Sequence, residues 1–345
     1  MHLIQMKINM QQNVPLAHLT TLKVGGEAEY FAVAESVEEL VALAGYARER
    51  WLVVHILGGG SNLLVSDAGV KGIVIKNEIK GISHVTEGET VLVTAGAGEE
   101  WDSFVGRTVT EGWWGLENLS AIPGTVGATP IQNVGAYGVE VGNLIREVKV
   151  YSLLEQKFLI MSQAECHFDY RDSIFKSEAG KEFVVVSVTY ALSATSNPQI
   201  HYKDLAEYFS SHVGEPSQEE IRNAVIEIRS KKFPDWKQLG TAGSFFKNPI
   251  ISAEHFNKLR DQYEGLPGYP TMDGAVKVSL GWILDKVCDL KGAREGNVGT
   301  YEKQSLVLIN YGGATEAEVD SFAETIKDVV LEKTKIKIEM EPQRW

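Results

Sequence analysis

Residues 117–140 read ENLSAIPGTVGATPIQNVGAYGVE, and this stretch decides which fold the sequence predicts. It is rich in glycine, contains two prolines, and has no charged residue between Glu117 and Glu140. A surface linker is more polar, and a helix or strand interior does not tolerate so many breakers. Because glycine has no Cβ, its backbone can approach another group closely. Two interpretations stay open from the stretch alone: a glycine-rich turn cluster inside a core, or the wall of a cofactor site.

Composition limits the class of protein. A chain of 345 residues is too long for one ordinary core, so two or three domains are expected. Hydrophobic residues at 44% and charged residues at 23% are typical of a globular protein. The formal charge of −13 argues against nucleic acid as a partner, although an anionic small molecule needs only a local cationic patch.

Targeting and metal signals are lacking in the sequence. No run approaches the roughly 20 apolar residues of a membrane span, and MHLIQMKINMQQN at the N-terminus lacks a signal-peptide core. Cys166 and Cys288 form no metal or redox pattern. We therefore expect a cytoplasmic protein without a metal or a membrane partner.

Three capping boxes predict helices, beginning after Ser36, Ser217 and Thr315. A further helix is expected near Trp101–Thr110. Short strands are expected over 52–56, 63–65, 147–152, 157–160 and 183–192, and a last one through Ile336, Ile338 and Met340.

The segment Leu57–Asn62, LGGGSN, joins two of these strands. A glycine loop between strands can offer backbone N–H groups to phosphate. It is not the usual dinucleotide fingerprint, because Leu63 stands where GxGxxG requires glycine. A tight hairpin without a ligand is the alternative.

Three further clusters carry chemistry. GTAGSFFKNP (240–249) sets the Ser244 hydroxyl beside amine and amide donors, YRDS (170–173) places Arg171 among aromatics, and the terminal EME offers Glu339 and Glu341. Taken singly, a polar loop, an Arg–Asp pair and a solvated edge strand explain them as well.

Together these motifs resemble one family. LGGGSN, the 117–140 stretch, YRDSIFK, TAGSFFKNP, GWILDKVCDLKG and QSLVLIN follow the order seen in UDP-N-acetylenolpyruvoylglucosamine reductases, the UDP-N-acetylmuramate dehydrogenases of peptidoglycan synthesis. The resemblance extends from about residue 13 to residue 341. The segment with Tyr202 is similar to the longer subclass, which carries a tyrosine loop over the substrate.

The resemblance implies an α+β fold with FAD bound, non-covalently, by two subdomains of the vanillyl-alcohol-oxidase type. It implies FAD-binding subdomain 1 over 1–80, completed by a C-terminal strand over 334–345, subdomain 2 over 81–230, and an α+β substrate-binding domain over 231–333. A monomer is the family expectation.

The resemblance also implies a set of site residues. The catalytic ones are Arg171, Ser244 and Glu341. Those that contact FAD are Leu57, Gly58, Gly59, Gly60, Ser61, Asn62, Ala121, Ile122, Pro123, Gly124, Gly127, Ala128, Ile131, Asn133, Gly135, Ala136, Tyr137 and Gly138. Those that contact the UDP-sugar substrate are Tyr202, Arg229, Lys232, Asn248, Tyr269, Lys291 and Gln304.

The implied reaction runs in two halves at one shared site. NADPH reduces the flavin and leaves, and the enolpyruvyl substrate then receives a hydride at its vinyl carbon. Arg171 and Glu341 stabilise the charge that develops next to the carboxylate, and Ser244 donates the proton. Glu341 can help only if it is protonated or hydrogen-bonded.

Two points stay open. The family continues its last strand beyond this glutamate, whereas here Pro342–Trp345 end the chain, so Glu339 is the runner-up for the catalytic carboxylate. Rival functions are another FAD oxidoreductase of the same fold, acting on a small alcohol or sugar, and a non-catalytic nucleotide-sugar binder.

Overall fold

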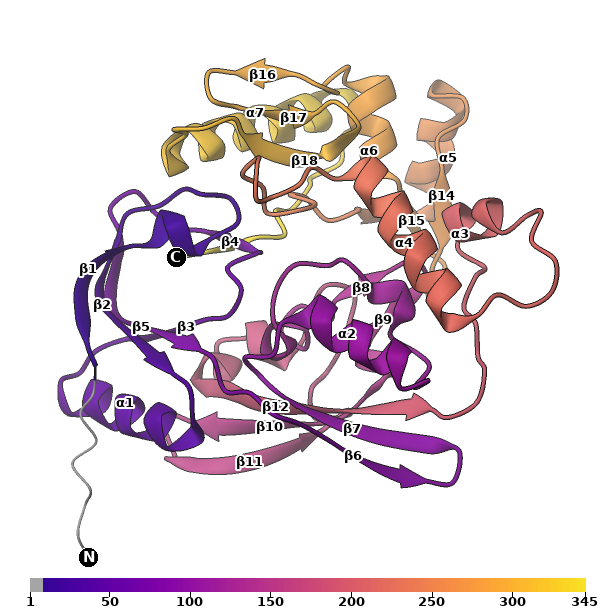
Figure 1. Cartoon of the computed structure of the whole chain (residues 1–345). Helices are drawn as coiled ribbons and strands as arrows, with labels where there is room; N and C mark the ends of the chain where they lie inside the picture. Colours follow the sequence, from indigo (N-terminus) through magenta and orange to yellow (C-terminus); the bar gives the residue numbers. More distant parts are fainter. Residues whose placement is uncertain (1–8) are drawn as a thin grey trace, which may run out of the picture. The chain divides into compact units, whose positions relative to one another are not determined.

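The computed structural model describes residues 9–345. The expectation that the N-terminus lacks a signal peptide concerns mainly residues 1–8, which lie outside the described residues. The described chain divides into two compact units, each assembled from segments that are far apart in the sequence (Figure 1). Unit 1 contains residues 9–14, 28–59 and 71–229. Unit 2 contains residues 15–27, 60–70 and 230–345. The three-domain division expected from the sequence stays a prediction.

Unit 1 begins with a four-stranded sheet that packs against helix α1. The strand order is β1-β2-β5-β3, and β3 and β5 run parallel. The elements are β1 (Gln11–Pro15), β2 (Glu27–Ala34), α1 (Val37–Glu49), β3 (Val54–Leu57) and β5 (Val70–Asn77). The Ser36 hydroxyl accepts a hydrogen bond from the Glu39 amide, which confirms the first predicted cap. The apolar face of α1 then packs against Ile73 and Ile75 of β5.

A five-stranded antiparallel sheet forms the rest of the unit 1 framework. Its strand order is β11-β10-β12-β7-β6. The strands are β6 (Ile82–Glu87), β7 (Thr90–Gly96), β10 (Ile145–Ser152), β11 (Lys157–Ser162) and β12 (Phe183–Ser193). Helix α2 (Trp101–Thr110), predicted at these residues, and the stretch 117–140 cover one face of this sheet (Figure 1). The Tyr190 hydroxyl of β12 lies 2.9 Å from the hydroxyl of Thr129 and fastens the stretch to the sheet.

The stretch itself is a chain of short turns, as its breakers predict. It contains η2 (Glu117–Leu119), η3 (Val126–Ala128), β8 (Gly135–Ala136) and β9 (Val139–Glu140). Beyond it, unit 1 adds η4 (Val141–Asn143), η5 (Ile174–Lys176), η6 (Ala179–Glu182), α3 (Lys203–Tyr208) and α4 (Gln218–Lys232), whose last residues enter unit 2. Ser217 and Glu220 bond to each other reciprocally at the start of α4, which confirms the second predicted cap.

Unit 2 is an α+β body with its own core. Phe245 and Phe246 lie at its centre, together with residues of α7 and, from the N-terminal segments, Leu22, Val24 and Leu64. Its elements are η1 (Leu16–Leu19), β4 (Leu63–Leu64), β13 (Ile250–Ile251), α5 (Ala253–Gln262), β14 (Gly268–Pro270), β15 (Val276–Val278), α6 (Leu280–Trp282), the π-helical η7 (Ile283–Val287), β16 (Arg294–Glu295), β17 (Val298–Tyr301), β18 (Gln304–Asn310), α7 (Glu316–Thr334) and β19 (Gln343–Arg344). Thr315 and Glu318 form the third predicted capping box.

The C-terminal segment differs from the prediction. The strand expected through Ile336, Ile338 and Met340 is not formed in these described residues, where Met340 makes one isolated bridge with Phe246. Ile336 and Ile338 are nevertheless buried, so the alternation reports packing against the core and not a hydrogen-bonded ladder. A regular strand, β19, forms only over Gln343–Arg344 and pairs in parallel with β4.

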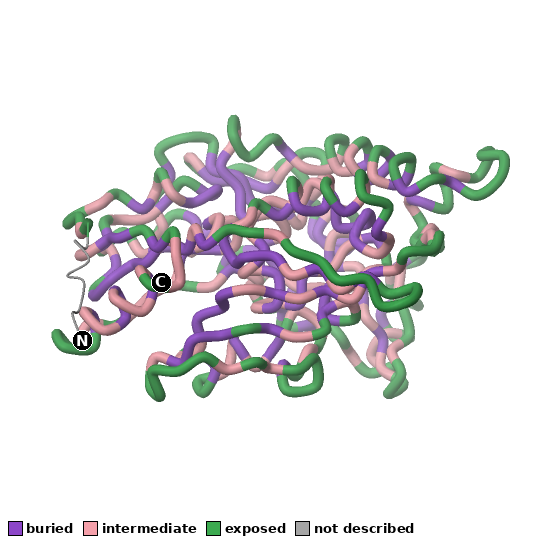
Figure 2. Tube along the Cα trace, turned by 60° about the horizontal axis from the view of Figure 1, so that its bottom comes forward, coloured by how far each residue is buried: buried purple, intermediate pink, exposed green. Residues whose placement is uncertain are grey.

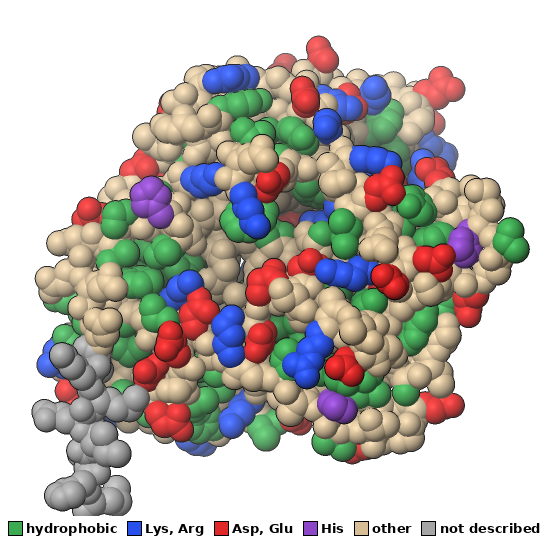
Figure 3. Space-filling view, viewed as in Figure 1, with side chains coloured by type: hydrophobic (Ala, Val, Ile, Leu, Met, Phe, Trp, Pro, Cys, Tyr) green, Lys and Arg blue, Asp and Glu red, His purple; other side chains and the backbone are tan. Residues whose placement is uncertain are grey.

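Exposed residues are concentrated on the turns and buried residues on the segments between them (Figure 2). On the face shown in Figure 3, acidic and basic side chains are interspersed and do not form a field of one sign. Within residues 9–345, no helix combines the length and the apolar character that crossing a membrane requires.

Candidate cofactor and active site

Two glycine segments of unit 1 pass each other at close range. A Cβ on Gly59 would lie 2.7 Å from the Gly124 Cα, and one on Gly58 would lie 2.6 Å from the Thr125 hydroxyl oxygen. Side chains other than hydrogen are therefore excluded at both positions by the neighbouring backbone or hydroxyl. Gly58 and Gly59 of LGGGSN are therefore required for this crossing, whatever the site binds.

The backbone amides at this crossing are open to a ligand. Within the described part of the chain, the N–H groups of Gly58, Gly59 and Gly124 donate to no protein acceptor, and all three residues are partly exposed. Oriented, unpaired N–H groups in a glycine loop form a binding place for an anion that needs no lysine. The donor set therefore fits a pyrophosphate.

LGGGSN does not form the hairpin that was the alternative. Strand β3 before it pairs with β5, whereas β4 after it pairs with β19. The second half of the segment belongs to unit 2, where the Gly60 carbonyl accepts from the Thr21 amide and Gly60 has φ 62°. The Asn62 side chain donates to the Glu341 carbonyl at 3.2 Å.

The stretch also holds the predicted catalytic arginine. Arg171 lies in a turn closed by two hydrogen bonds between Asp169 and Asp172, and its backbone has φ 54°. Its guanidinium donates to the Gly135 carbonyl at 2.6 Å. Asn133 donates to the Asp169 carbonyl at 3.0 Å, and the buried Ser173 hydroxyl donates to the Ile131 carbonyl at 2.6 Å. Three bonds from one stretch therefore fix the position of Arg171.

Gly135 is matched to this arrangement. A Cβ there would lie 2.9 Å from the Glu140 side chain and 3.1 Å from the Arg171 guanidinium. Several of the remaining predicted cofactor residues are buried or packed against the core. Leu57 is buried, a Cβ on Gly127 would lie 2.6 Å from that of Ala97, and Ile122, Ile131 and Ala136 pack against the sheet core.

The end of the stretch carries the segment with Tyr202. The Tyr137 and Tyr202 rings meet edge to face, 5.5 Å apart. The buried Asn118 amide donates to the carbonyls of Tyr137 (2.8 Å) and Gln199 (2.7 Å). Tyr202 itself is 45% exposed, so its ring is partly available for contact.

Arg229 and Tyr137 form a polar pair that is largely removed from solvent. Burial raises the pKa of Tyr137 to about 12, while the charge of Arg229 and its hydrogen bond with the phenol oppose that rise. Burial lowers the pKa of Arg229, and Tyr137 and Asp102 act against it. The Arg229 Nε donates to the Ala121 carbonyl at 3.2 Å. Arg229, a predicted substrate contact, therefore also bonds through its Nε to the 117–140 stretch.

In unit 2, Ser244 lies at the start of a bridged segment. It follows Gly243, which has φ 75°, and it pairs with Val307 of β18. The next residue, Phe245, is fully buried and its amide donates to the Leu306 carbonyl at 2.8 Å. Ser244 is only partly buried, so a rigid core anchors a hydroxyl that remains accessible.

The two glutamate candidates have different surroundings. The Glu341 amide donates to the carbonyl of Phe245, the neighbour of Ser244, at 2.9 Å, and Glu341 is partly buried. The Glu339 side chain is 75% exposed and pairs with Lys247 at 3.2 Å. Glu339 therefore forms an ion pair at the surface.

The other predicted substrate residues of unit 2 are distributed over several elements. The Asn248 side chain accepts from the Leu280 amide at 3.0 Å, and the Gln304 side-chain oxygen Oε1 accepts from the Leu306 amide at 3.2 Å. Lys291 pairs with Asp285 at 3.2 Å after the π-helical turn. Tyr269 on β14 is 51% exposed, and Lys232 ends α4.

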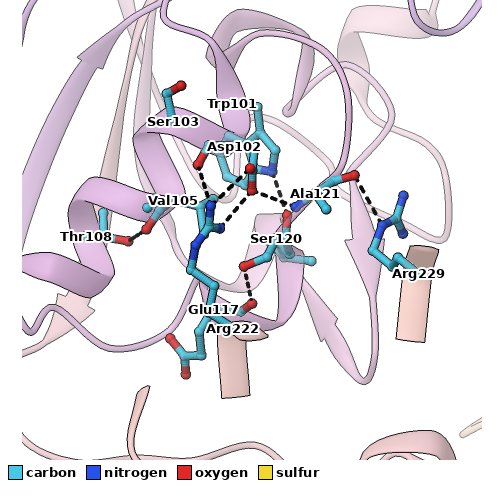
Figure 4. A network of polar contacts seen from close by, with 12 residues as sticks. Trp101, Asp102, Ser103, Val105, Thr108, Glu117, Ser120, Ala121, Arg222 and Arg229 are labelled. Atoms are coloured by element: carbon cyan, nitrogen blue, oxygen red, sulfur yellow. Dashed lines mark hydrogen bonds and ion pairs between the residues drawn. The ribbon is translucent and has the colours of Figure 1, made fainter. Parts of the chain in front are cut away.

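Sequence reasoning missed three polar residues that bond to the stretch or lie in it: the fully buried Glu117 and Asn118, and the partly buried Asp102. Asp102 bonds to Ala121 and the Glu117 carbonyl accepts from Ser120 (Figure 4), while Asn118 bonds to Tyr137. In the sequence, Asp102 is an acid in the first turn of a helix, and Glu117 and Asn118 are ordinary loop residues. Burial raises the pKa of Glu117, against hydrogen bonds from Gly115 and Gln218. No local pattern distinguishes such residues, because their partners are distant in the chain.

Comparison with known proteins matches two family descriptions. An FAD binding domain matches residues 28–152, and the C-terminal domain of UDP-N-acetylenolpyruvoylglucosamine reductase matches residues 235–345. A reductase of that name from Chromobacterium violaceum is 40% identical and covers 98% of this chain and 99% of its own. One from Neisseria gonorrhoeae is 41% identical, covering 90% and 89%. The crystal structure of the Thermus caldophilus enzyme shares the fold, with a TM-score of 0.67 at 23% identity over 98% of this chain and 99% of that one.

Proposed function

The chain belongs to the UDP-N-acetylenolpyruvoylglucosamine reductase family, and from this membership we propose how its residues carry out the family's reaction. It is an FAD-dependent oxidoreductase of α+β fold. It reduces UDP-N-acetyl-3-O-(1-carboxyvinyl)glucosamine to UDP-N-acetylmuramate with NADPH, a step of peptidoglycan precursor synthesis. The carrying observation is that an FAD binding domain and this reductase's C-terminal domain follow each other in one chain.

Bound FAD would supply the hydride-transfer chemistry between NADPH and the vinyl carbon of the substrate. The amides of Gly58, Gly59 and Gly124 would hold its pyrophosphate, since they are unpaired within the described chain and their glycines leave room. The rest of the 117–140 stretch would line the cofactor. The residues present fit the group.

Arg171 would bind and polarise the substrate carboxylate. Its guanidinium is already oriented by the Gly135 carbonyl, and its turn is bonded to Asn133 and Ile131, so little reorganisation is needed. A guanidinium matches a carboxylate with two parallel hydrogen bonds, which a lysine cannot reproduce.

Ser244 would donate the proton to the carbon that bears the carboxylate. Its position is rigid because Phe245 is buried and bonded to β18. Glu341 would assist, since its backbone is bonded to the residue next to Ser244, whereas Glu339 faces Lys247. Tyr202, Arg229, Lys232, Asn248, Tyr269, Lys291 and Gln304 would contact the UDP-sugar.

The remaining parts of the proposal concern context. NADPH and the substrate would use one site in turn, which predicts that high substrate concentrations inhibit in competition with NADPH. We also propose a cytoplasmic monomer. Sedimentation at several protein concentrations tests the oligomeric state separately from activity.

The central experiment follows flavin colour without oxygen. The purified protein should be yellow, NADPH should bleach it, and the enolpyruvyl substrate should restore the colour. Ser244→Ala should keep the bleaching but slow the return of colour by about 10²–10⁴-fold, the usual contribution of general acid catalysis. Glu341→Gln should act on the same half-reaction, with Glu339→Gln as the matched control. A colourless protein that no added FAD turns yellow would refute the proposed function.

A further inference from the structure

The backbone of Ala121 sets the direction in which the chain approaches the glycine crossing. Ala121 has φ 57°, a conformation that is unfavourable for an L-residue with a Cβ. Two residues later the chain reaches Pro123 and then Gly124, which lies against Gly59. A change in the Ala121 conformation would therefore redirect the amide of Gly124.

Asp102 holds that conformation from helix α2. Its carboxylate accepts a hydrogen bond from the Ala121 amide at 2.6 Å (Figure 4). The same carboxylate accepts two bonds from Arg222 of α4, at 2.7 and 3.0 Å. The Ala121 carbonyl accepts from Arg229, also of α4. Both peptide groups of Ala121 are thus bonded to side chains from α2 and α4.

The neighbouring residues reinforce this anchor. The Trp101 indole donates to the Leu119 carbonyl at 2.9 Å, and the Ser120 hydroxyl donates to the Glu117 carbonyl at 2.6 Å. Burial acts to raise the pKa of Asp102, but the bonds from Arg222 and the Ala121 amide lower it overall. A charged acceptor makes a stronger hydrogen bond to an amide than a neutral one.

We propose that Asp102 is a positioning residue for FAD binding: its carboxylate holds the left-handed Ala121 and so orients the amides of the 117–140 stretch toward the cofactor. This inference rests on the proposed FAD-dependent function. A purely structural alternative is that Asp102 and Arg222 form an ion pair joining α2 to α4, with no consequence for the loop. The hydrogen bond to Ala121 distinguishes the two.

The test compares variants of the apoprotein by their dissociation constant for FAD and by the visible circular dichroism of the bound flavin. Asp102→Ala removes both the ion pair and the Ala121 bond, and should raise the dissociation constant about tenfold. Arg222→Gln removes the ion pair but keeps the acceptor for Ala121. It should stay within about threefold of the wild type.

A double variant gives the decisive comparison. Glycine adopts positive φ without the cost that alanine bears. Asp102→Ala should therefore weaken FAD binding much less in an Ala121→Gly background, by about threefold or less, because the two sites are coupled. Asp102→Asn keeps a neutral acceptor and serves if the alanine variant does not fold. It should bind FAD between the wild type and Asp102→Ala.

Equal effects of Asp102→Ala and Arg222→Gln on FAD binding, with no relief by Ala121→Gly, would show that the ion pair matters and the positioning does not. FAD binding by the wild-type protein distinguishes failure of this inference from failure of the proposed function. If the wild-type protein binds no FAD, the proposed function fails. If it binds FAD and Asp102→Ala binds it equally well, only the role of Asp102 fails.

Discussion

Residues with a Cβ adopt left-handed backbone conformations at several points of the candidate site. Ala121, Asn133 and Tyr137 of the stretch have φ between 45° and 57°, and Arg171 has φ 54°. Each such residue costs of order 1–3 kcal/mol unless the surroundings fix it. Here they are fixed, by Asp102 at Ala121 and by the Gly142 amide at Asn133. Backbone strain of this kind persists mainly at binding and catalytic sites, so these residues mark this part of the molecule as functional.

The sequence revealed part of this residue-scale arrangement. The glycines indicated close approach of backbones, and the crossing of Gly59 and Gly124 is such an approach. The left-handed alanine and arginine could not be predicted, because their conformations depend on Asp102, Gly135 and other residues distant in the chain. Backbone carbonyls, such as that of Gly135, are present in every residue, so their role as hydrogen-bond acceptors cannot be recognised from the sequence.

Glu117 predicts a pH dependence at the residue scale. Burial raises its pKa in the folded protein, whereas the unfolded chain ionises near 4.3. Between these two values the folded state binds more protons, so the free energy of unfolding should fall as pH rises and then level off. Glu117→Gln should remove this fall. Urea unfolding of both apoproteins from pH 4 upward measures the difference, and identical pH profiles would contradict the assignment.

At the scale of elements, the capped helices were predictable and the last strand was not. Ser36, Ser217 and Thr315 each begin a helix in the structure, because a capping box is a local device written within four residues. The prediction of the last strand was wrong over residues 336–340, because Ile336 and Ile338 are buried at alternate positions, as they would be in a strand. Whether the predicted catalytic and substrate residues act as proposed stays a prediction.

Asn118 links two elements and gives a prediction at this scale. Its amide joins the Tyr137 carbonyl, at the end of the stretch, to Gln199, three residues before Tyr202. Asn118→Ala should loosen residues 199–208, raise hydrogen exchange there and increase the KM for the UDP-sugar several-fold. Asn197→Ala is the matched control, since the exposed Asn197 side chain accepts a hydrogen bond from the exposed Gln199 side chain. Unchanged exchange in Asn118→Ala would refute the link.

At the scale of the whole molecule, unit 2 is assembled from three separate segments. Leu22, Val24 and Leu64 share one buried core with Phe245 and with residues of α7. The family resemblance predicted FAD-binding subdomains over 1–80 and 81–230, the first completed by a strand over 334–345, and a substrate-binding domain over 231–333. No periodicity in residues 15–27 or 60–70 shows that they belong with residues beyond 230. Such long-range assembly depends on packing, which local patterns do not encode.

Leu22 tests this assembly. Leu22→Ala removes a fully buried side chain and should lower the stability of unit 2 by about 2–5 kcal/mol. Hydrogen exchange should rise in α7 while β12 of unit 1 stays protected. Leu331→Ala, at a position of α7 that is 37% exposed, is the control and should cost much less. Equal loss of protection in β12 would contradict the division into separate cores.

The three-segment construction of unit 2 has a consequence for how the protein is made. Residues 15–27 and 60–70 leave the ribosome early, but their core partners lie in the last third of the chain. At about 5–20 residues per second, on the order of ten seconds pass before residues beyond 230 emerge. Unit 1 can complete itself during translation, whereas Leu22, Val24 and Leu64 must wait as uncovered apolar side chains on the nascent polypeptide. Ribosome-associated chaperones therefore have a defined interval, and a defined pair of segments, in which to act.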